Sequence, residues 1–247
     1  TAMRVPDPGI RALFAREQSW QAWLDCEAEL ADAEAELGMV PAEAAAEIRR
    51  KARLELIDIS KVEEGLRVTG HPLVPLNYFN IVKLKRGETF ISTVPGYETG
   101  IVPATGTFDI TTMGETFAQI GQRRLNVWDG EPEGVYVPTS APATITCTSD
   151  TAEIFISGAR FDETLKPFAV RAADIDLVQY GSDDTKTHRK IKHILGTKYH
   201  GRVGRLLVSE LFTVGAGGWS GFPSHKHDTT RLPLETRHDE VYNFRFN

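Results

Sequence analysis

Three residues near the end of the sequence are of types that bind transition metals. His225 and His227 are separated by one residue, and Glu240 opens the alternating stretch EVYNFRF. Because alternate residues of a strand face the same side, a strand would present both imidazoles together. Two imidazoles and a carboxylate suit Zn²⁺, Mn²⁺, Fe²⁺ or Ni²⁺. The spacing predicts a divalent metal site; the alternative is a polar hairpin with solvated histidines.

Neighbouring side chains could bind or convert a substrate at such a site. Lys226 and Arg231 carry positive charges that can pair with a substrate carboxylate. Tyr242 lies two residues after Glu240 and would share its face of a strand, so we consider it a catalytic candidate. His238 could be a substitute metal ligand. The alternatives are a solvated charged loop, a core tyrosine and a surface histidine.

The elements that must position these residues follow a first part of the chain with a helical pattern. Gly38 is expected to end one helix, and Pro41 to lie just inside the start of a second. A short third helix is expected over residues 56–70, capped by Asp58 or Ser60. The apolar repeat of the first helix, spaced as in a helical bundle, comprises Trp23, Leu30 and Leu37.

After about residue 75 the pattern changes to strands. Short segments rich in β-branched and aromatic residues alternate with Gly, Pro, Ser and Asp, which is typical of a sandwich or barrel. Helices first and strands afterwards predict an α+β chain with separate units rather than one α/β sheet. Pro72 and Pro75 mark the expected junction.

Composition narrows the class of protein. Hydrophobic residues make up 41% and charged residues 25%, as in a globular protein. The net charge of −6 argues against a general nucleic-acid binder. Since no apolar run approaches the roughly 20 residues of a membrane span and no signal peptide opens the sequence, we expect a cytoplasmic protein. Cys26 and Cys147 are expected to be reduced thiols.

Residues 78–247 resemble the 5-deoxy-glucuronate isomerase family. The resemblance lies in GRLLVSELFTVGAGGWSGFPSHKHD and DEVYNFRF, with support from HRKIKHIL and VYVPTSAPATIT. It implies a bicupin fold, with a first cupin over residues 77–170 and the start of a second over residues 171–247. The second barrel is expected to be incomplete.

The same resemblance implies a function in inositol catabolism. In the family a divalent transition metal is held by the positions of His225, His227 and Glu240 and by one later histidine, which has no counterpart before Asn247. The implied reaction is aldose–ketose isomerisation of a deoxy sugar acid, an intramolecular oxidoreduction in which the metal polarises a carbonyl. We expect this activity to be impaired, and the open barrel to favour a homo-oligomer or an assembly completed by a partner.

Residues 1–76 resemble the N-terminal domain of the fumarase/aspartase lyase superfamily, of the 3-carboxy-muconate cycloisomerase and adenylosuccinate lyase type. The resemblance rests on MRVPDPGIRALFAREQSWQAWLDCEAELADAEAELG and TGHPLVPL, and it implies that His71 binds an anionic substrate. The serine loop Gly-Ser-Ser-x-Met-Pro has no counterpart, so no lyase activity is expected. A lyase or cycloisomerase, a non-catalytic cupin-scaffold binding module and a chimeric chain remain the alternatives.

Overall fold

The structure is a computed structural model that describes residues 16–56, 68–71, 74–215, 217–218, 220 and 227–245. The chain divides into two compact units, Thr1–Glu64 and Gly65–Asn247, which we call the helical unit and the β unit. The predicted α+β character, with a small helical part followed by a mostly β part, is confirmed.

The helical unit is an antiparallel pair of helices followed by one turn. Its elements are α2 (Arg16–Glu36), α3 (Ala42–Lys51) and the 3-10 helix η1 (Leu54–Leu56). Gly38 has a φ of 71°, a left-handed conformation that suits glycine after a helix end, as predicted. Pro41 is the N-cap of α3 rather than a residue inside it, and its φ of −62° matches the proline ring.

The contact between α2 and α3 uses small residues instead of the predicted apolar repeat. Ala28, Ala31 and Ala45 are buried, which lets the helices approach closely. Gln21 adds two hydrogen bonds to the following turn: its amide donates to the Ala52 carbonyl and accepts from the Leu54 N–H. The side chains of the apolar repeat are exposed by 45% at Trp23, 46% at Leu30 and 75% at Leu37.

The expected third helix does not reach Gly70. Val68–His71 is instead strand β1, which pairs with β2 (Val74–Lys85). The division between the units falls earlier than the predicted boundary at residue 76. Of the two prolines expected to mark the junction, Pro75 lies in β2 and Pro72 falls outside the described residues. Asp58 and Ser60 fall outside the described residues.

The β unit contains thirteen strands in three sheets within its described residues. The six-stranded sheet has the order β1-β2-β9-β4-β7-β10, the four-stranded sheet β3-β8-β5-β6, and the three-stranded sheet β11-β12-β13. The remaining strands are β3 (Thr89–Ser92), β4 (Tyr97–Thr105), β5 (Phe108–Thr112), β6 (Glu115–Ile120), β7 (Gly134–Val137), β8 (Ala143–Cys147), β9 (Thr151–Arg160), β10 (Phe168–Val170), β11 (Asp176–Tyr180), β12 (Arg189–Leu195) and β13 (Val208–Thr213). Two 3-10 turns, η2 (Ala172–Asp174) and η3 (Thr197–Tyr199), join later strands.

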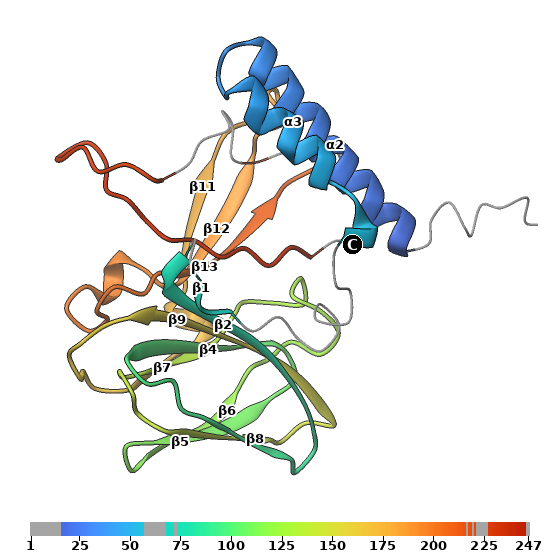
Figure 1. Ribbon diagram of the computed structural model, residues 1–247. Coiled ribbons are helices and arrows are strands. Elements are labelled where there is room, and N and C mark those ends of the chain that lie inside the picture. Colours follow the sequence, from blue (N-terminus) through green and yellow to red (C-terminus); the bar gives the residue numbers. More distant parts are fainter. Residues whose placement is uncertain are drawn as a thin grey trace, which may run out of the picture. The chain divides into compact units, whose positions relative to one another are not determined.

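The two larger sheets face each other as a sandwich (Figure 1), and an apolar core fills the space between them. β9 shows how the sequence produces this core. Its residues alternate between buried and partly exposed, and Ile154 and Ile156 point inward because alternate strand residues share a face. Across the core they share one apolar cluster with Phe108, Ile110 and Ile145 from the four-stranded sheet. Each such side chain contributes roughly 1.5–3 kcal/mol through burial.

A second apolar cluster joins the three-stranded sheet to the other face of the six-stranded sheet. On β7, Val135 belongs to the sandwich core, whereas Tyr136 belongs to the second cluster with Ile194 and Leu195. Gly100 allows this close approach, because a Cβ there would lie 3.0 Å from a Leu195 methyl carbon. The predicted cupin boundary at residue 170 coincides with the passage from β10 to β11; the division into two cupins remains a prediction.

Candidate metal and substrate site

The region of the predicted metal site is a closed loop. An antiparallel bridge joins Arg231 to Glu235, with the Arg231 N–H donating to the Glu235 carbonyl at 3.0 Å. At the base of the loop the His238 N–H donates to the His227 carbonyl at 2.8 Å. His225 and Lys226 lie outside the described residues.

The loop brings two histidines together that are distant in sequence. The ring centroids of His227 and His238 are 5.1 Å apart, with an interplanar angle of 43°. His227 is partly exposed and His238 is exposed. The sequence singled out His238 as a candidate ligand, but gave no sign that its ring contacts His227.

Glu240 and Tyr242 interact, although not through a strand. The expected strand over EVYNFRF is not formed within its described part, because residues 236–245 have neither helix nor strand. The Tyr242 hydroxyl donates to Glu240 Oε1 at 3.2 Å, and its ring stacks on Phe244. Burial raises the pKa of the Tyr242 phenol, and the negative charge of Glu240 raises it further. The phenol is therefore protonated in neutral water and can act as a hydrogen-bond donor.

The predicted substrate-binding residues have different surroundings. Arg231 Nε lies 2.6 Å from Glu235 Oε1, so its guanidinium already has an anionic partner. This pair is largely exposed, and exposed pairs contribute little, about 0–1 kcal/mol. A substrate carboxylate could therefore replace Glu235. His71 lies in β1, where its backbone is paired with Val74, and its side chain is outside the described part.

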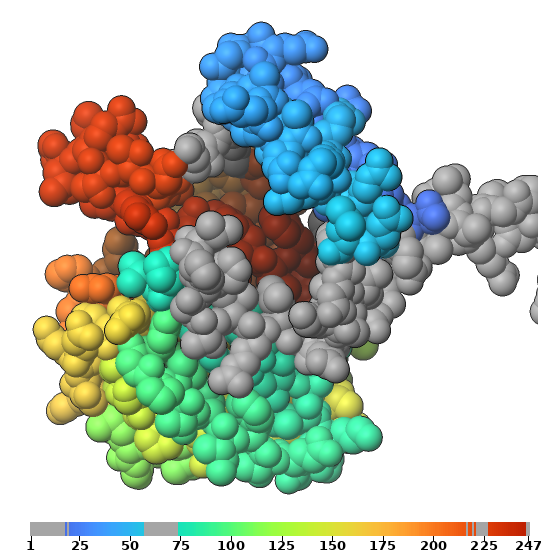
Figure 2. Space-filling view, viewed as in Figure 1, coloured from blue at the N-terminus to red at the C-terminus, as the bar shows by residue number. Residues whose placement is uncertain are grey.

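Two contacts that the sequence did not reveal anchor this segment to the β unit. The Asp239 carboxylate accepts from the Leu76 N–H at 3.0 Å, and its side chain is 4% exposed. Arg245 donates two hydrogen bonds to Glu153 on β9, and its guanidinium lies over the Phe155 ring at 5.1 Å. Residues 227–245 are surface residues, coloured red in Figure 2. The two anchors therefore determine where Glu240 and its neighbours lie on this surface.

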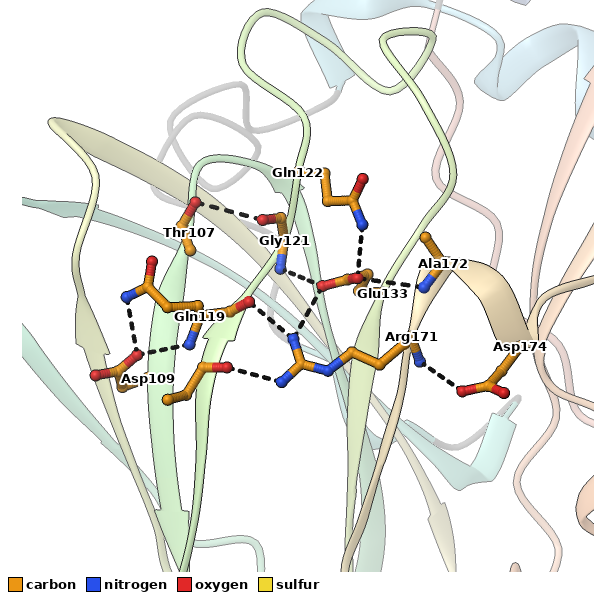
Figure 3. A network of polar contacts seen from close by, with 10 residues as sticks. Thr107, Asp109, Gln119, Gly121, Gln122, Glu133, Arg171, Ala172 and Asp174 are labelled. Carbon is orange, nitrogen blue, oxygen red and sulfur yellow. Dashed lines mark hydrogen bonds and ion pairs between the residues drawn. The ribbon is translucent and has the colours of Figure 1, made fainter.

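A buried carboxylate organises the loop between β6 and β7 (Figure 3). Glu133 accepts hydrogen bonds from the backbone N–H groups of Gly121 and Ala172, and from the Gln122 side chain. Burial raises the pKa of the Glu133 carboxyl, but these hydrogen bonds and the charge of Arg171 lower it by more, so the pKa lies below its ordinary value. Glu133 is thus a structural carboxylate, bound on all sides by the protein.

The same loop is connected to the three-stranded sheet by an ion pair. Arg123 is 2% exposed and forms two hydrogen bonds with Glu210 on β13, at 2.7 and 2.5 Å. Lys192 on β12 lies beside it and pairs with Glu131. These charged side chains are paired with one another within the protein. Their pairing offsets the cost of burying polar groups between the loop and the sheet.

Residues 227–245 carry imidazole and carboxylate side chains, which are the ligand types that divalent transition metals take. Among the residues that the structure describes, no group of three or more His, Cys, Asp and Glu side chains is arranged to hold an ion. His225 is outside that set, so the predicted trio of His225, His227 and Glu240 remains a prediction. In the same described part, no helix is long and apolar enough to cross a membrane.

Comparison with known proteins gives consistent matches. A 5-deoxy-glucuronate isomerase from Shouchella clausii is 31% identical over 171 residues, which cover 68% of this chain and 61% of the relative. The Bacillus subtilis protein of the same name is 30% identical over 165 residues, covering 66% and 59%. The crystal structure of an IolB-like protein from Salmonella typhimurium is similar with a TM-score of 0.60 and 25% identity, covering 69% of this chain and 63% of that one.

These relatives are longer than the present sequence, which spans less than two thirds of each. The family model described as "KduI/IolB family" matches residues 60–247. That match contains the whole described β unit and the His-x-His and Glu-Val-Tyr motifs, and it does not cover residues 16–56. The chain therefore belongs to the KduI/IolB family.

Proposed function

We propose that this chain carries out the metal-dependent aldose–ketose isomerisation of a deoxy sugar acid of the 5-deoxy-glucuronate type, as part of inositol catabolism. The observation that carries the proposal is the family match over residues 60–247, because it includes His225, His227 and Glu240 in the pattern expected for the metal ligands. The relatives at 31% and 30% identity carry the name of this activity.

Because the core of the sandwich is apolar, we expect the metal and substrate site to lie outside the sandwich. Its interior is filled mainly by large aliphatic and aromatic side chains, which solvate a cation poorly. The polar surface segment over residues 227–245 supplies imidazole and carboxylate side chains instead. We therefore assign the chemistry to this segment rather than to the first cupin.

Each residue of the proposed site has a role that its chemistry allows. His225, His227 and Glu240 would hold the ion, which when bound would supply Lewis-acid polarisation of the substrate carbonyl. The protonated Tyr242 hydroxyl would donate a hydrogen bond to an oxygen of the sugar. Lys226 and Arg231 would pair with the substrate carboxylate.

Metal content and turnover test this proposal together. We expect the purified chain to contain Zn²⁺, Mn²⁺, Fe²⁺ or Ni²⁺ by elemental analysis, and to isomerise a 5-deoxy uronate. His227→Ala should lose the metal and reduce turnover about 100-fold or more, since a catalytic metal contributes several kcal/mol. His200→Ala removes an exposed histidine elsewhere and should change neither. Equal metal content in all three proteins would overturn the site assignment.

The resemblance of residues 1–76 to lyases supports a second proposal, a β-elimination or cycloisomerisation with His71 in the substrate site. Residues 1–64 form a compact unit, whereas His71 lies in β1 of the β unit. An elimination assay on a succinyl-type substrate distinguishes the two. We expect no turnover; activity that disappears in His71→Ala would instead favour the lyase. Inactivity in both assays would favour the binding-module alternative.

A further inference from the structure

We propose that Arg202 and Tyr199 form a binding site for the carboxylate of a small organic acid. Tyr199 ends the 3-10 turn η3, and Arg202 follows it in the connection from β12 to β13. This connection, GTKYHGRVGRL over residues 196–206, carries two arginines, a lysine and a histidine but no acidic residue. The proposal goes beyond the proposed function and does not require the metal.

The Arg202 guanidinium lies against aromatic rings. Its Cζ atom is 4.0 Å from the centre of the Phe168 ring and 5.7 Å from the centre of the Tyr199 ring. The two rings pack on each other, with centroids 5.0 Å apart. An aromatic face attracts the guanidinium but leaves its N–H donors for other partners. No side chain or carbonyl of the described residues accepts from these donors, so a ligand can use them.

Tyr199 brings a second donor to the same place. The residue is 7% exposed and its ring belongs to the second apolar cluster, yet its hydroxyl has no hydrogen-bond partner within the described part of the chain. The hydroxyl oxygen is not fully enclosed, so a ligand can reach it. Burial raises the pKa of the Tyr199 phenol, and the charge of Asp174 raises it further, while Arg202 opposes the shift. The phenol is therefore protonated in neutral water and can donate.

The backbone of this connection is fixed by the protein itself. The Arg202 N–H donates to the Tyr199 carbonyl at 2.8 Å. The completely buried carboxylate of Glu98 accepts from the N–H groups of residues 204–206. Because these hydrogen bonds form without a ligand, little conformational freedom is lost when one binds.

The neighbouring charges favour a ligand with one negative charge. The Lys198 ammonium lies 3.9 Å from the Asp176 carboxylate and donates to the Asp174 carbonyl, and the Asp174 carboxylate accepts from the Arg171 N–H. These groups are already engaged with one another, whereas Arg202 has no anionic partner among the residues described. One guanidinium balances one carboxylate and matches its planar geometry, while a phosphate carries nearly two charges.

A titration followed by NMR tests this site. The full chain is titrated with D-glucuronate, with D-glucose, which lacks the carboxylate, and with inorganic phosphate. The signals recorded are the arginine Nε–H groups and the backbone N–H groups of residues 199–206. Arg202→Lys keeps the charge and identifies the Arg202 signal by its loss, and Tyr199→Phe removes only the hydroxyl. The matched control is Arg189→Lys, because Arg189 also lies over a tyrosine ring, 5.6 Å from that of the exposed Tyr180.

We expect D-glucuronate to shift the Arg202 Nε–H signal with a Kd of about 1 mM, as for a small ion held by a few hydrogen bonds. Arg202→Lys should weaken binding about tenfold, because the planar pair of donors is lost, and Tyr199→Phe about three- to tenfold. D-glucose should cause no shift, phosphate should bind more weakly than D-glucuronate, and Arg189→Lys should match the unaltered chain.

The His227→Ala variant separates this proposal from the proposed function. It should bind D-glucuronate at Arg202 unchanged, since residues 227–245 contact β2 and β9, whereas Arg202 lies over Phe168 on β10. An Arg202 signal that D-glucuronate leaves unshifted would overturn the site, as would an equal response to D-glucose. Tighter binding of phosphate would overturn the assignment of a carboxylate. Equal affinities in Arg202→Lys and Arg189→Lys would show that the guanidinium does not bind the ligand, whether or not Tyr199→Phe folds.

Discussion

Glu98 is a completely buried carboxylate that joins β4 to the segment before β13. It accepts a hydrogen bond from the Tyr136 hydroxyl at 2.7 Å, and from the backbone N–H groups of Gly204, Arg205 and Leu206. Burial raises the pKa of the Tyr136 phenol, and Glu98 raises it further, so the phenol remains a donor. One side chain thus accepts hydrogen bonds from four donors, of which the Tyr136 hydroxyl is buried and the three backbone N–H groups are partly buried.

Removing this carboxylate should therefore destabilise the β unit strongly. We expect Glu98→Ala to lower the free energy of unfolding by about 3–5 kcal/mol, because four donors, one of them buried, lose their acceptor. Tyr136→Phe removes a single donor and should cost less, about 1–2 kcal/mol. Urea denaturation measures both, with the exposed Glu163→Ala as the control. A similar loss in Glu98→Ala and in Glu163→Ala would contradict this role.

At the scale of the elements, hydrogen bonds and an ion pair made by charged side chains hold the loop between β6 and β7 in place. Glu133 holds its start near Gly121 and connects it to the turn η2 through Ala172. Arg123 connects the same loop to β13 through Glu210. Breaking such a buried pair on one side typically costs about 3–5 kcal/mol, because a buried charge is left alone. The position of the three-stranded sheet therefore relies on these contacts as well as on its apolar cluster.

The lowered pKa of Glu133 makes this connection sensitive to acid. Its carboxyl has a lower pKa in the folded protein than the ordinary 4.5, so the ionised form stabilises the fold. That stability is fully present above pH 4.5 and is lost as the pH falls through the folded-state pKa.

Comparison with Glu133→Gln tests this dependence. We expect the unaltered chain to be the more stable at neutral pH, and the difference from Glu133→Gln to shrink as the pH falls below 4.5. Urea unfolding at successive pH values measures the difference, with Glu163→Gln as the exposed control. A difference that stays constant down to about pH 3 would show that Glu133 ionisation does not contribute.

For the whole molecule, the two core clusters lie within the β unit. All their residues fall between Tyr78 and Val208, so the β unit has its own core. β2 is paired with β1 on one side and β9 on the other, which makes residues 74–85 an internal part of this unit.

A chain shortened to residues 65–247 should therefore fold. We expect a strand-type circular dichroism spectrum and a cooperative thermal transition within a few degrees of that of the longer chain, because the apolar burial that drives folding is retained. A version that begins after residue 76 lacks β1 and the start of β2, and should be less stable. If the two shortened chains were equally stable, the boundary predicted at residue 76 would be the better one.

Local sequence patterns were sufficient for the kinds of element in each part of the chain. Proline and glycine near residues 38–41 predicted the turn between α2 and α3, since their backbone preferences act within a few residues. The short segments rich in β-branched and aromatic residues predicted strands after about residue 75, and β9 is one of them. The His-x-His and Glu-Val-Tyr motifs, together with the flanking segments, were enough to identify the family. A motif is recognised by its residue types and their spacing, which the sequence shows directly.

The tertiary structure alone decided which polar residues are buried together and where the units divide. Glu98 meets Gly204 across 106 positions and Arg123 meets Glu210 across 87, so no local pattern could indicate them. The contact of His227 with His238 depends on a loop closed by backbone hydrogen bonds. β1 adds to the β unit a segment that the sequence predicted to be helical. Each of these outcomes is set by pairing between distant segments, whose free energy outweighs the weak local preferences of the residues involved.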